Sequence, residues 1–99
     1  MGAQERLEAL RAAIPSLTPE QALSAQRSGA VLVDVRDPEE TAQGLPRGAL
    51  ALGRGFLELR IGQEVPDTDR PLLMLCATGA RSLFAAESLR SLGYRDVRN

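Results

Sequence analysis

Short apolar runs alternate along this chain with segments whose apolar residues recur every three or four positions. The two clearest runs are Val31–Val35 and Leu72–Leu75, and both are apolar on either face, as strands in the middle of a parallel sheet are. Ala49–Leu52 is a shorter candidate strand, and another begins within Tyr94–Asn99. The pattern therefore predicts a central parallel sheet of four to five strands.

The segments between these runs have the spacing of amphipathic helices. In Ala3–Ile14, apolar residues stand at helical intervals between charged ones. Thr18 is a suitable N-cap for a second helix, because Pro19 follows it and Gln21 completes a capping box, and Gly29 closes that helix. Three more helices are predicted: one capped by Asp37, one over Phe56–Ile61 with Phe56, Leu57 and Ile61 facing inward, and one over Ser82–Leu92 closed by Gly93. Strands that alternate with helices indicate an α/β fold with helices on both faces of the sheet.

The composition limits the function classes that need to be considered. The 99 residues suit one small domain, and a net charge of −1 with three aromatic residues argues against nucleic acid as a partner. No apolar stretch approaches the roughly 20 residues of a membrane helix, so we expect no membrane partner. A single cysteine excludes an internal disulfide and favours a reducing compartment such as the cytoplasm.

The chain contains no histidine. This absence excludes Ser–His triads, Cys–His dyads and most zinc sites, and we expect neither a metal nor a cofactor. A reactive cysteine in this chain must be activated by backbone N–H groups, by a helix N-terminus or by arginine.

The strongest candidate for chemistry is Cys76, which lies between the second apolar run and the last predicted helix. A lone cysteine is more often a buried apolar residue than a reactive one. Here, however, it stands at the carboxyl end of a strand, where α/β sheets bind ligands, and Gly79 permits a tight turn with positive φ. Such a loop would aim N–H groups and the positive helix end at the sulfur, which favours the thiolate. The candidate binding loop comprises Ala77, Thr78, Gly79, Ala80, Arg81 and Ser82.

Charged and polar residues near this loop have roles that the sequence leaves partly open. Two roles suit Arg81 equally: attracting an anionic substrate, or pairing with a carboxylate to brace the helix. We expect the Ser82 hydroxyl to support the loop at the helix N-terminus. Asp34, Arg36 and Glu40 follow the first buried strand, and we expect them to form an internal charge network that fixes the strand end.

Four separated motifs resemble those of rhodanese-like domains, in the same order along the chain. They are Leu32–Glu40 (LVDVRDPEE), Gly44–Ala49 (GLPRGA), Cys76–Ser82 (CATGARS) and Leu89–Val97 (LRSLGYRDV). The resemblance covers residues 16–99 and implies a three-layer rhodanese-like sandwich. Residues 1–15 would then be an N-terminal extension that forms an amphipathic helix.

The resemblance implies a sulfurtransferase. The Cys76 thiolate would take the outer sulfur of thiosulfate or of a persulfide donor, hold it as a persulfide within the loop and pass it to a thiophilic acceptor. It also implies that Asp34 and Arg36 lie behind the active loop. Arg54–Ile61 is similar to rhodanese domains fused to adenylyltransferases that sulfurate small carrier proteins. The partners implied are a small sulfur donor and either a sulfur-carrier protein or a fused adenylyltransferase domain.

Two other functions stay open. Cysteine phosphatases and arsenate reductases have a related loop with the spacing C-x5-R, whereas Cys76 and Arg81 give C-x4-R. The smaller bowl suits a single sulfur atom better than a phosphoryl group. The second alternative is a non-catalytic rhodanese-fold module that regulates or docks a partner.

The chain departs from the family pattern at three places. Leu45 stands where the family motif G-H-I-P-G-A has histidine, and Thr41 stands where an aromatic residue is usual. The sequence also ends at Asn99, before the G-G-x-x-x-W tail helix of the family. The first two changes affect local packing, and the third would leave part of one sheet face uncovered.

Overall fold

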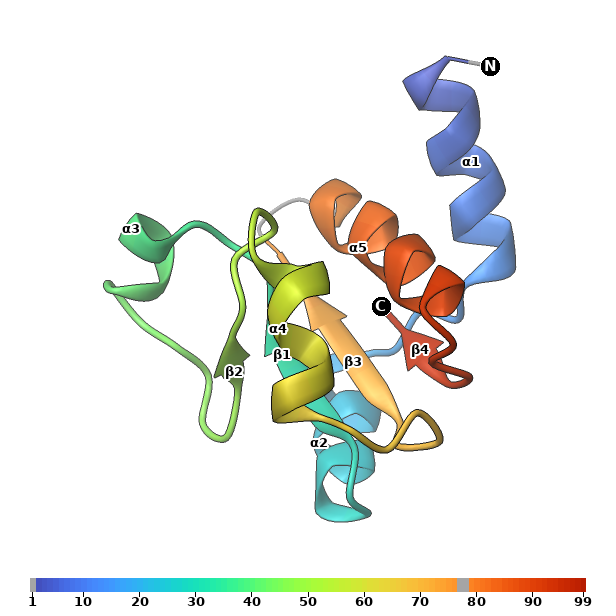
Figure 1. The fold of residues 1–99 in the computed structure, drawn as a ribbon. Helices are drawn as coiled ribbons and strands as arrows, with labels where there is room; N and C mark the ends of the chain where they lie inside the picture. Colours follow the sequence, from blue (N-terminus) through green and yellow to red (C-terminus); the bar gives the residue numbers. More distant parts are fainter. Residues whose placement is uncertain (1, 77–78) are drawn as a thin grey trace.

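A parallel sheet forms the centre of the molecule, which is described by a computed structural model over residues 2–76 and 79–99. Within these residues the sheet has four strands in the order β2-β1-β3-β4, and every neighbouring pair is parallel (Figure 1). The strands are β1 (Val31–Asp34), β2 (Leu50–Ala51), β3 (Leu72–Leu75) and β4 (Val97–Arg98). The predicted parallel sheet is therefore confirmed.

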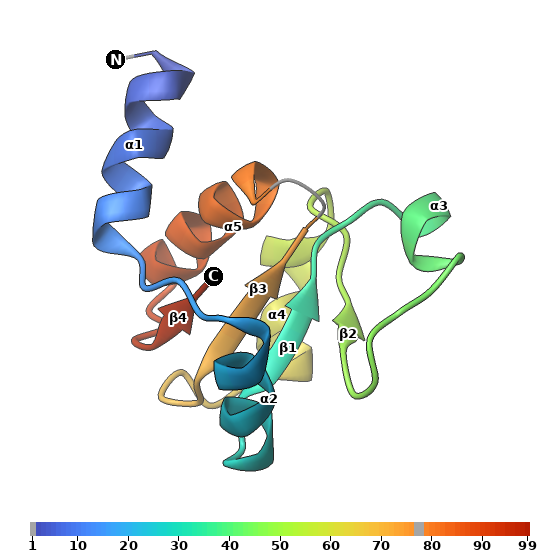
Figure 2. The same cartoon turned by 180° about the vertical axis from the view of Figure 1, so that it is seen from behind.

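Helices lie on both faces of this sheet. They are α1 (Ala3–Ala13), α2 (Pro19–Arg27), α3 (Pro38–Thr41), α4 (Leu57–Glu64) and α5 (Ala80–Ser91). In Figure 1, α4 and α5 lie in front of the sheet, and the reverse view in Figure 2 brings α2 to the front. The three-layer α/β arrangement is confirmed, and α1 packs against α5.

Two of the helices begin at the capping residues that the sequence predicted. The Gln21 N–H donates to Thr18 Oγ1 at 3.1 Å, and the Thr18 N–H donates to Gln21 Oε1 at 2.9 Å, so the capping box is formed. The Asp37 N–H donates to Glu40 Oε1 at 3.1 Å at the start of α3. These bonds satisfy backbone donors that the first helical turn leaves unpaired.

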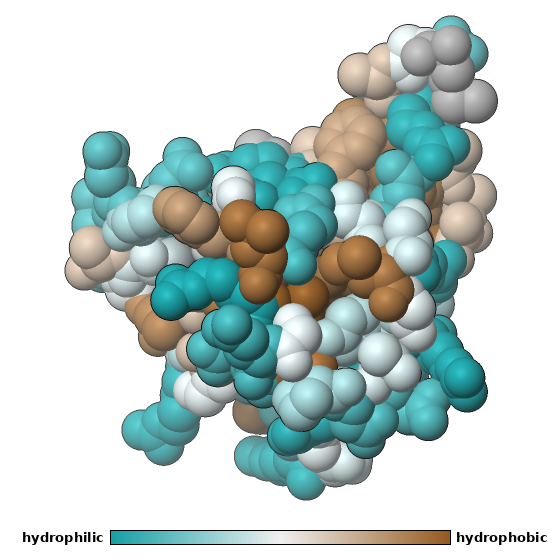
Figure 3. Space-filling view, in the orientation of Figure 1, coloured by the Kyte–Doolittle hydropathy of each residue, from teal (hydrophilic) through white to brown (hydrophobic). Residues whose placement is uncertain are grey.

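The predicted inward orientation of Phe56 is wrong. Its side chain is 56% exposed, whereas Leu57 and Ile61 are buried as expected. The reason is that α4 begins at Leu57, and Phe56 is the preceding N-cap residue, so its side chain lies off the buried stripe of the helix. Together with Leu59, which is 79% exposed, it contributes hydrophobic surface to α4; Figure 3 shows hydrophobic patches on this side of the molecule.

The core lies between the sheet and the α4–α5 layer. It includes alternate residues of the two central strands and the inner sides of both helices, and Leu10 and Ile14 from the N-terminal segment also join it. The buried side chains of the central strands on this face are Val33, Leu72 and Met74. No helix in the described part of the chain has the length and apolar character needed to cross a membrane.

The opposite face of the sheet has less cover. In the described residues α2 is the helix on this face (Figure 2), and an apolar groove of about 510 Å³ runs beside it. Leu32, Leu73 and Leu75 form its floor, because alternate strand residues point to the same side. Asn99 lies at the rim of this groove and also reaches the candidate site.

Candidate active site

The candidate site lies at the carboxyl edge of the sheet, where β1 and β3 end side by side. Asp34 is paired in register with Leu75, so the residues that follow each strand emerge together. Cys76 is half-buried immediately after β3, and Arg36 follows β1 by two positions. A parallel sheet collects ligands at this edge, which is where the sequence predicted the chemistry.

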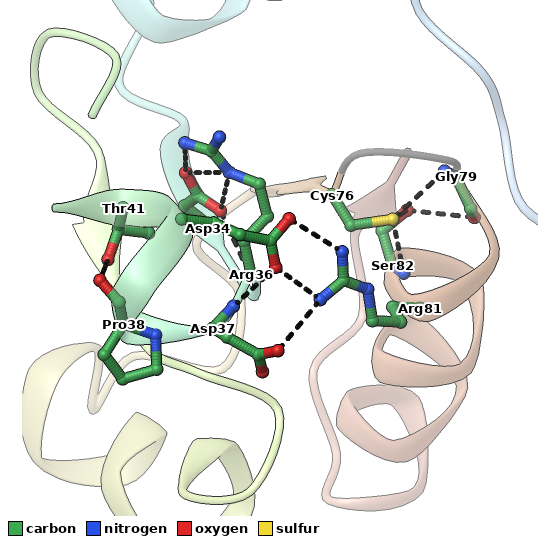
Figure 4. A network of polar contacts seen from close by, with 10 residues as sticks. Asp34, Arg36, Asp37, Pro38, Thr41, Cys76, Gly79, Arg81 and Ser82 are labelled. Atoms are coloured by element: carbon green, nitrogen blue, oxygen red, sulfur yellow. Dashed lines mark hydrogen bonds and ion pairs between the residues drawn. The ribbon is translucent and has the colours of Figure 1, made fainter. Parts of the chain in front are cut away.

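The Cys76 sulfur accepts hydrogen bonds from the backbone amides of Gly79 and Ser82. The Gly79 N–H donates to Sγ at 3.0 Å, and the Ser82 N–H donates at 3.3 Å (Figure 4). Gly79 has φ of +83°, so the predicted positive φ is confirmed, and it directly precedes α5. Amide donors and the positive helix end both stabilise negative charge on sulfur.

Of the residues that the sequence assigns to the loop, the structure describes Gly79, Ala80, Arg81 and Ser82. Ala80 is the first residue of α5, so the helix begins earlier than the predicted Ser82 and brings its N-terminus closer to Cys76. Ala77 and Thr78, which the sequence also assigns to the loop, lie outside the described residues.

Ser82 connects the sulfur to the end of β4. It is 1% exposed, and its Oγ accepts from the Cys76 thiol at 3.4 Å. The same hydroxyl is positioned to donate to the Gly79 carbonyl at 3.0 Å and to Asn99 Oδ1. Sequence reasoning predicted the supporting role of Ser82 but missed Asn99. The available signal was its place at the carboxyl end of a predicted strand, since parallel strands end at one edge.

Arg81 pairs with carboxylates of α3. Its guanidinium donates to both oxygens of Glu40, at 2.8 and 3.1 Å, and lies 3.8 Å from Asp37 Oδ2. Figure 4 shows Arg81 pointing toward Asp37, whereas the Cys76 sulfur faces Gly79 and Ser82. The Arg81 hydrogen bonds, followed by the backbone N–H of Asp37, lower the pKa of Glu40 to about 2. Of the two roles open to Arg81, this geometry supports the bracing one.

Asp34 and Arg36 form a second ion pair, at the end of β1. Asp34 is fully buried, and its carboxylate accepts from Arg36 Nε at 2.9 and 3.0 Å, from Nη2 at 2.7 Å and from the Arg36 backbone N–H at 3.0 Å. Arg36 Nη2 also donates to the Gly44 carbonyl at 2.8 Å, which fixes the segment after α3. Glu40 hydrogen-bonds to Arg81 and not to Arg36, but it still interacts with Arg36 electrostatically. The expected charge network therefore consists of two hydrogen-bonded pairs that are coupled through Arg36 and Glu40.

Several known proteins are similar to this chain in sequence and in fold. A family model for the rhodanese-like domain matches residues 18–99. The thiosulfate sulfurtransferase GlpE of Haemophilus influenzae is 37% identical over 82 residues, which cover 82% of this chain and 75% of that protein. A sulfurtransferase of Allochromatium vinosum is 41% identical over 69 residues, covering 70% of this chain and 63% of that protein.

Solved structures agree with these relatives. The human single-domain sulfurtransferase TSTD1 superposes with a TM-score of 0.75 and 32% identity, over 86% of this chain and 87% of that one. A protein of unknown function from Rhodopseudomonas palustris is described as a possible tyrosine phosphatase. It superposes with a TM-score of 0.81 and 30% identity, over 99% of this chain and 82% of that one. Because the family model spans most of the chain and relatives of more than 30% identity match it, the chain belongs to the family of rhodanese-like domains.

Proposed function

We propose that this protein is a sulfurtransferase that carries sulfane sulfur as a persulfide on Cys76. The observation that carries the proposal is the pair of amide hydrogen bonds from Gly79 and Ser82 to the Cys76 sulfur at the N-terminus of α5. This arrangement stabilises a sulfur anion without histidine, which the chain lacks. The names of the relatives from Haemophilus influenzae and Allochromatium vinosum support the same activity.

The reaction has two displacement steps at sulfur. In the first, the Cys76 thiolate attacks the outer sulfur of thiosulfate, the S–S bond of thiosulfate breaks, and sulfite leaves with the bonding electron pair. In the second, a thiophilic acceptor attacks the terminal sulfur of the persulfide, and the Cys76 thiolate leaves. Both steps place negative charge on sulfur near the loop, and the amides of the loop stabilise that charge electrostatically.

The remaining site residues support this chemistry without touching the transferred sulfur. We assign Arg81 to bracing the loop through Glu40, since both carboxylate oxygens occupy its guanidinium. Asp34 and Arg36 hold the end of β1 and the segment that contains Gly44. We also assign Ala77, Thr78 and Ala80 to the binding loop, because small residues there suit a tight turn beside Cys76.

The proposed donor is a small sulfane-sulfur compound such as thiosulfate or a persulfide. For the acceptor we propose a small sulfur-carrier protein or a fused adenylyltransferase domain, because Arg54–Ile61 is similar to rhodanese domains joined to such enzymes. Residues 16–99 would form the catalytic domain, with residues 1–15 as an extension. The single cysteine supports a cytoplasmic setting.

Incubation with thiosulfate followed by intact-protein mass measurement tests the proposal. We expect the wild-type chain to gain the mass of one sulfur atom, and we expect cyanide to remove it. Cys76→Ala should show no gain. Absence of the adduct on a folded wild-type chain would contradict sulfur transfer and favour the docking module, and cysteine-dependent hydrolysis of an aryl phosphate would favour a phosphatase.

A further inference from the structure

Asn99 places its side-chain amide between Gly79 and the Ser82 hydroxyl that contacts the reactive sulfur. Its Oδ1 accepts from Ser82 Oγ, and its Nδ2 lies 3.9 Å from the point where a Cβ on Gly79 would sit. The backbone of Asn99 is held independently of this side chain: its N–H donates to the Pro15 carbonyl at 2.8 Å, and its carbonyl accepts from the Leu17 N–H at 3.0 Å. The amide is therefore presented to the loop from a fixed strand end.

The Ser82 hydroxyl has one proton to donate, and both the Gly79 carbonyl and Asn99 Oδ1 can accept it. The Gly79 carbonyl at 3.0 Å and Asn99 Oδ1 are both acceptors, so the proton is directed away from sulfur. The lone pairs of Oγ then face Cys76, and the thiol donates its own proton to them at 3.4 Å. This orientation suits a neutral thiol.

The thiolate needs the opposite orientation. Once the thiol has lost its proton, the lone pairs of Ser82 Oγ repel the anion, whereas the O–H group would stabilise it. The hydroxyl can turn toward sulfur if Asn99 stops accepting and donates instead. Rotation of the amide by half a turn does this, because Nδ2 replaces Oδ1 and donates to Ser82 Oγ.

We infer that Asn99 is a positioning residue, which sets the direction of the Ser82 hydroxyl and so couples the end of β4 to the charge state of Cys76. The inference rests on the proposed function for its catalytic meaning, but the coupling itself is a property of the thiol. It assigns a role to a residue that hydrogen-bonds to Ser82, whose hydroxyl in turn contacts the sulfur.

Other charges near the sulfur do not supply this coupling. Arg81 lies on the same helix end and interacts electrostatically with Cys76, but its guanidinium is paired with Glu40 and approaches Asp37 on α3. Asn99 approaches from the end of β4, on a different element, and its side chain carries no charge. Variants of Asn99 can therefore be compared with the Arg81–Glu40 pair left intact.

The test is a double-mutant cycle between Asn99 and Ser82 with the titration of Cys76 as the measurement. Thiolate formation is followed by ultraviolet absorbance and by the pH dependence of alkylation with iodoacetamide. Asn99→Asp has only acceptor oxygens, so it fixes the hydroxyl away from sulfur and adds a negative charge. We expect its titration midpoint to rise by about one pH unit, a tenfold smaller thiolate fraction below the midpoint. Asn99→Ala should raise the midpoint less, because only the Gly79 carbonyl then competes for the hydroxyl.

The Ser82→Ala background separates positioning from a structural effect. There the Asn99→Ala shift should vanish and the Asn99→Asp shift should fall by at least half, leaving only the effect of charge. Shifts of unchanged size in that background would overturn the inference, as would wild-type midpoints in both single variants. Thermal melts identify any variant that fails to fold, and a change in melting temperature without a change in midpoint also overturns it.

These measurements do not depend on sulfur transfer. If thiosulfate leaves no adduct on the wild type while the cycle shows coupling, the proposed function fails and the positioning role stands. If the adduct forms and the cycle is additive, the positioning role fails alone. With both intact, the rate of persulfide formation at neutral pH should fall about tenfold in Asn99→Asp, in step with its thiolate fraction.

Discussion

The two sides of the cysteine loop are built from different chemistry. On one side, uncharged amides of Gly79 and Ser82 contact the sulfur directly. On the other side, full charges on Arg81 and Glu40 pair with each other and link α3 to the N-terminal end of α5. The contrast shows a division of labour: fixed dipoles stabilise the anion, and ion pairs hold the elements that carry those dipoles. Dipoles suit the first task because they are preorganised and need no counter-ion.

The amide side should be the more sensitive to substitution. Gly79→Val should abolish persulfide formation, because a β-branched residue resists φ of +83° and would turn the N–H away from Cys76. Steric overlap is not the cause, since an added Cβ would have Asn99 Nδ2, at 3.9 Å, as its nearest neighbour. Persulfide formation is measured by intact mass after incubation with thiosulfate.

A matched control exists at the other end of the same helix. Gly93 has φ of +102° and open space around its Cβ position, so Gly93→Val strains the backbone in the same way, away from the sulfur. We expect Gly93→Val to lower the melting temperature while the folded protein still forms the persulfide. Gly79→Asn should keep part of the activity, because asparagine tolerates positive φ. Full activity in Gly79→Val would show that the amide contact is dispensable.

The pair between Asp34 and Arg36 should matter mostly for the stability of the fold. Asp34→Ala leaves Arg36 without its carboxylate and removes the anchor that Arg36 provides to Gly44 through the same guanidinium. We expect the free energy of unfolding to fall, because the hydrogen bonds of Asp34 to Arg36 are lost, although the partly exposed guanidinium can be hydrated. Urea denaturation measures it, and the activity of the remaining folded fraction should change little. A normal unfolding free energy with lost activity would instead give Asp34 a direct part in the reaction.

The sequence predicted the features of this site that depend on neighbours along the chain. The capping residues Thr18 and Asp37, the strand before Cys76 and the positive φ of Gly79 all follow from local patterns. The same local patterns predicted that Phe56 faces inward, which is wrong. The helix begins one residue later, at Leu57, so Phe56 precedes it and its side chain is exposed.

Contacts between distant segments could not be assigned in advance. Arg81 could have faced a substrate or a carboxylate, and only the position of α3 shows that Glu40 occupies it. The place of Asn99 at a strand end puts it at the right edge of the sheet, but no motif links it to Ser82, 17 residues earlier. The packing of α1 on α5 is also a tertiary feature, since its apolar stripe would suit any partner helix.

Substitution of Glu40 distinguishes the two roles of Arg81, because the two roles predict opposite changes in the rate of persulfide formation. Glu40→Gln keeps the shape of the side chain and removes its charge. If Arg81 braces the loop, persulfide formation should slow by about tenfold, because α3 no longer holds the guanidinium in place. If Arg81 instead attracts anionic donors, freeing it should make the reaction faster.

The control for this variant is the ion pair between Arg54 and Glu58 on α4. Glu58 is exposed to a similar degree, and its carboxylate accepts from Arg54 at 2.7 and 2.8 Å. Glu58→Gln removes one carboxylate charge away from the sulfur, so we expect its rate of persulfide formation to match the wild type. A slowing shared by both variants would indicate a general effect of surface charge.

The smallest effect is expected from acid. The pKa of Glu40 is about 2 in the folded protein and near 4.5 in the unfolded chain, so the unfolded state binds its proton first as the pH falls. The stabilisation from this group is therefore complete above about pH 5 and is lost as the pH falls toward 2. Because the pair is exposed, the change should be modest and should shrink in high salt. The urea midpoint of the wild type should fall more steeply over this pH window than that of Glu40→Gln. If the two midpoints fall in parallel, the Arg81–Glu40 pair contributes nothing to folding, and its role is confined to positioning the loop.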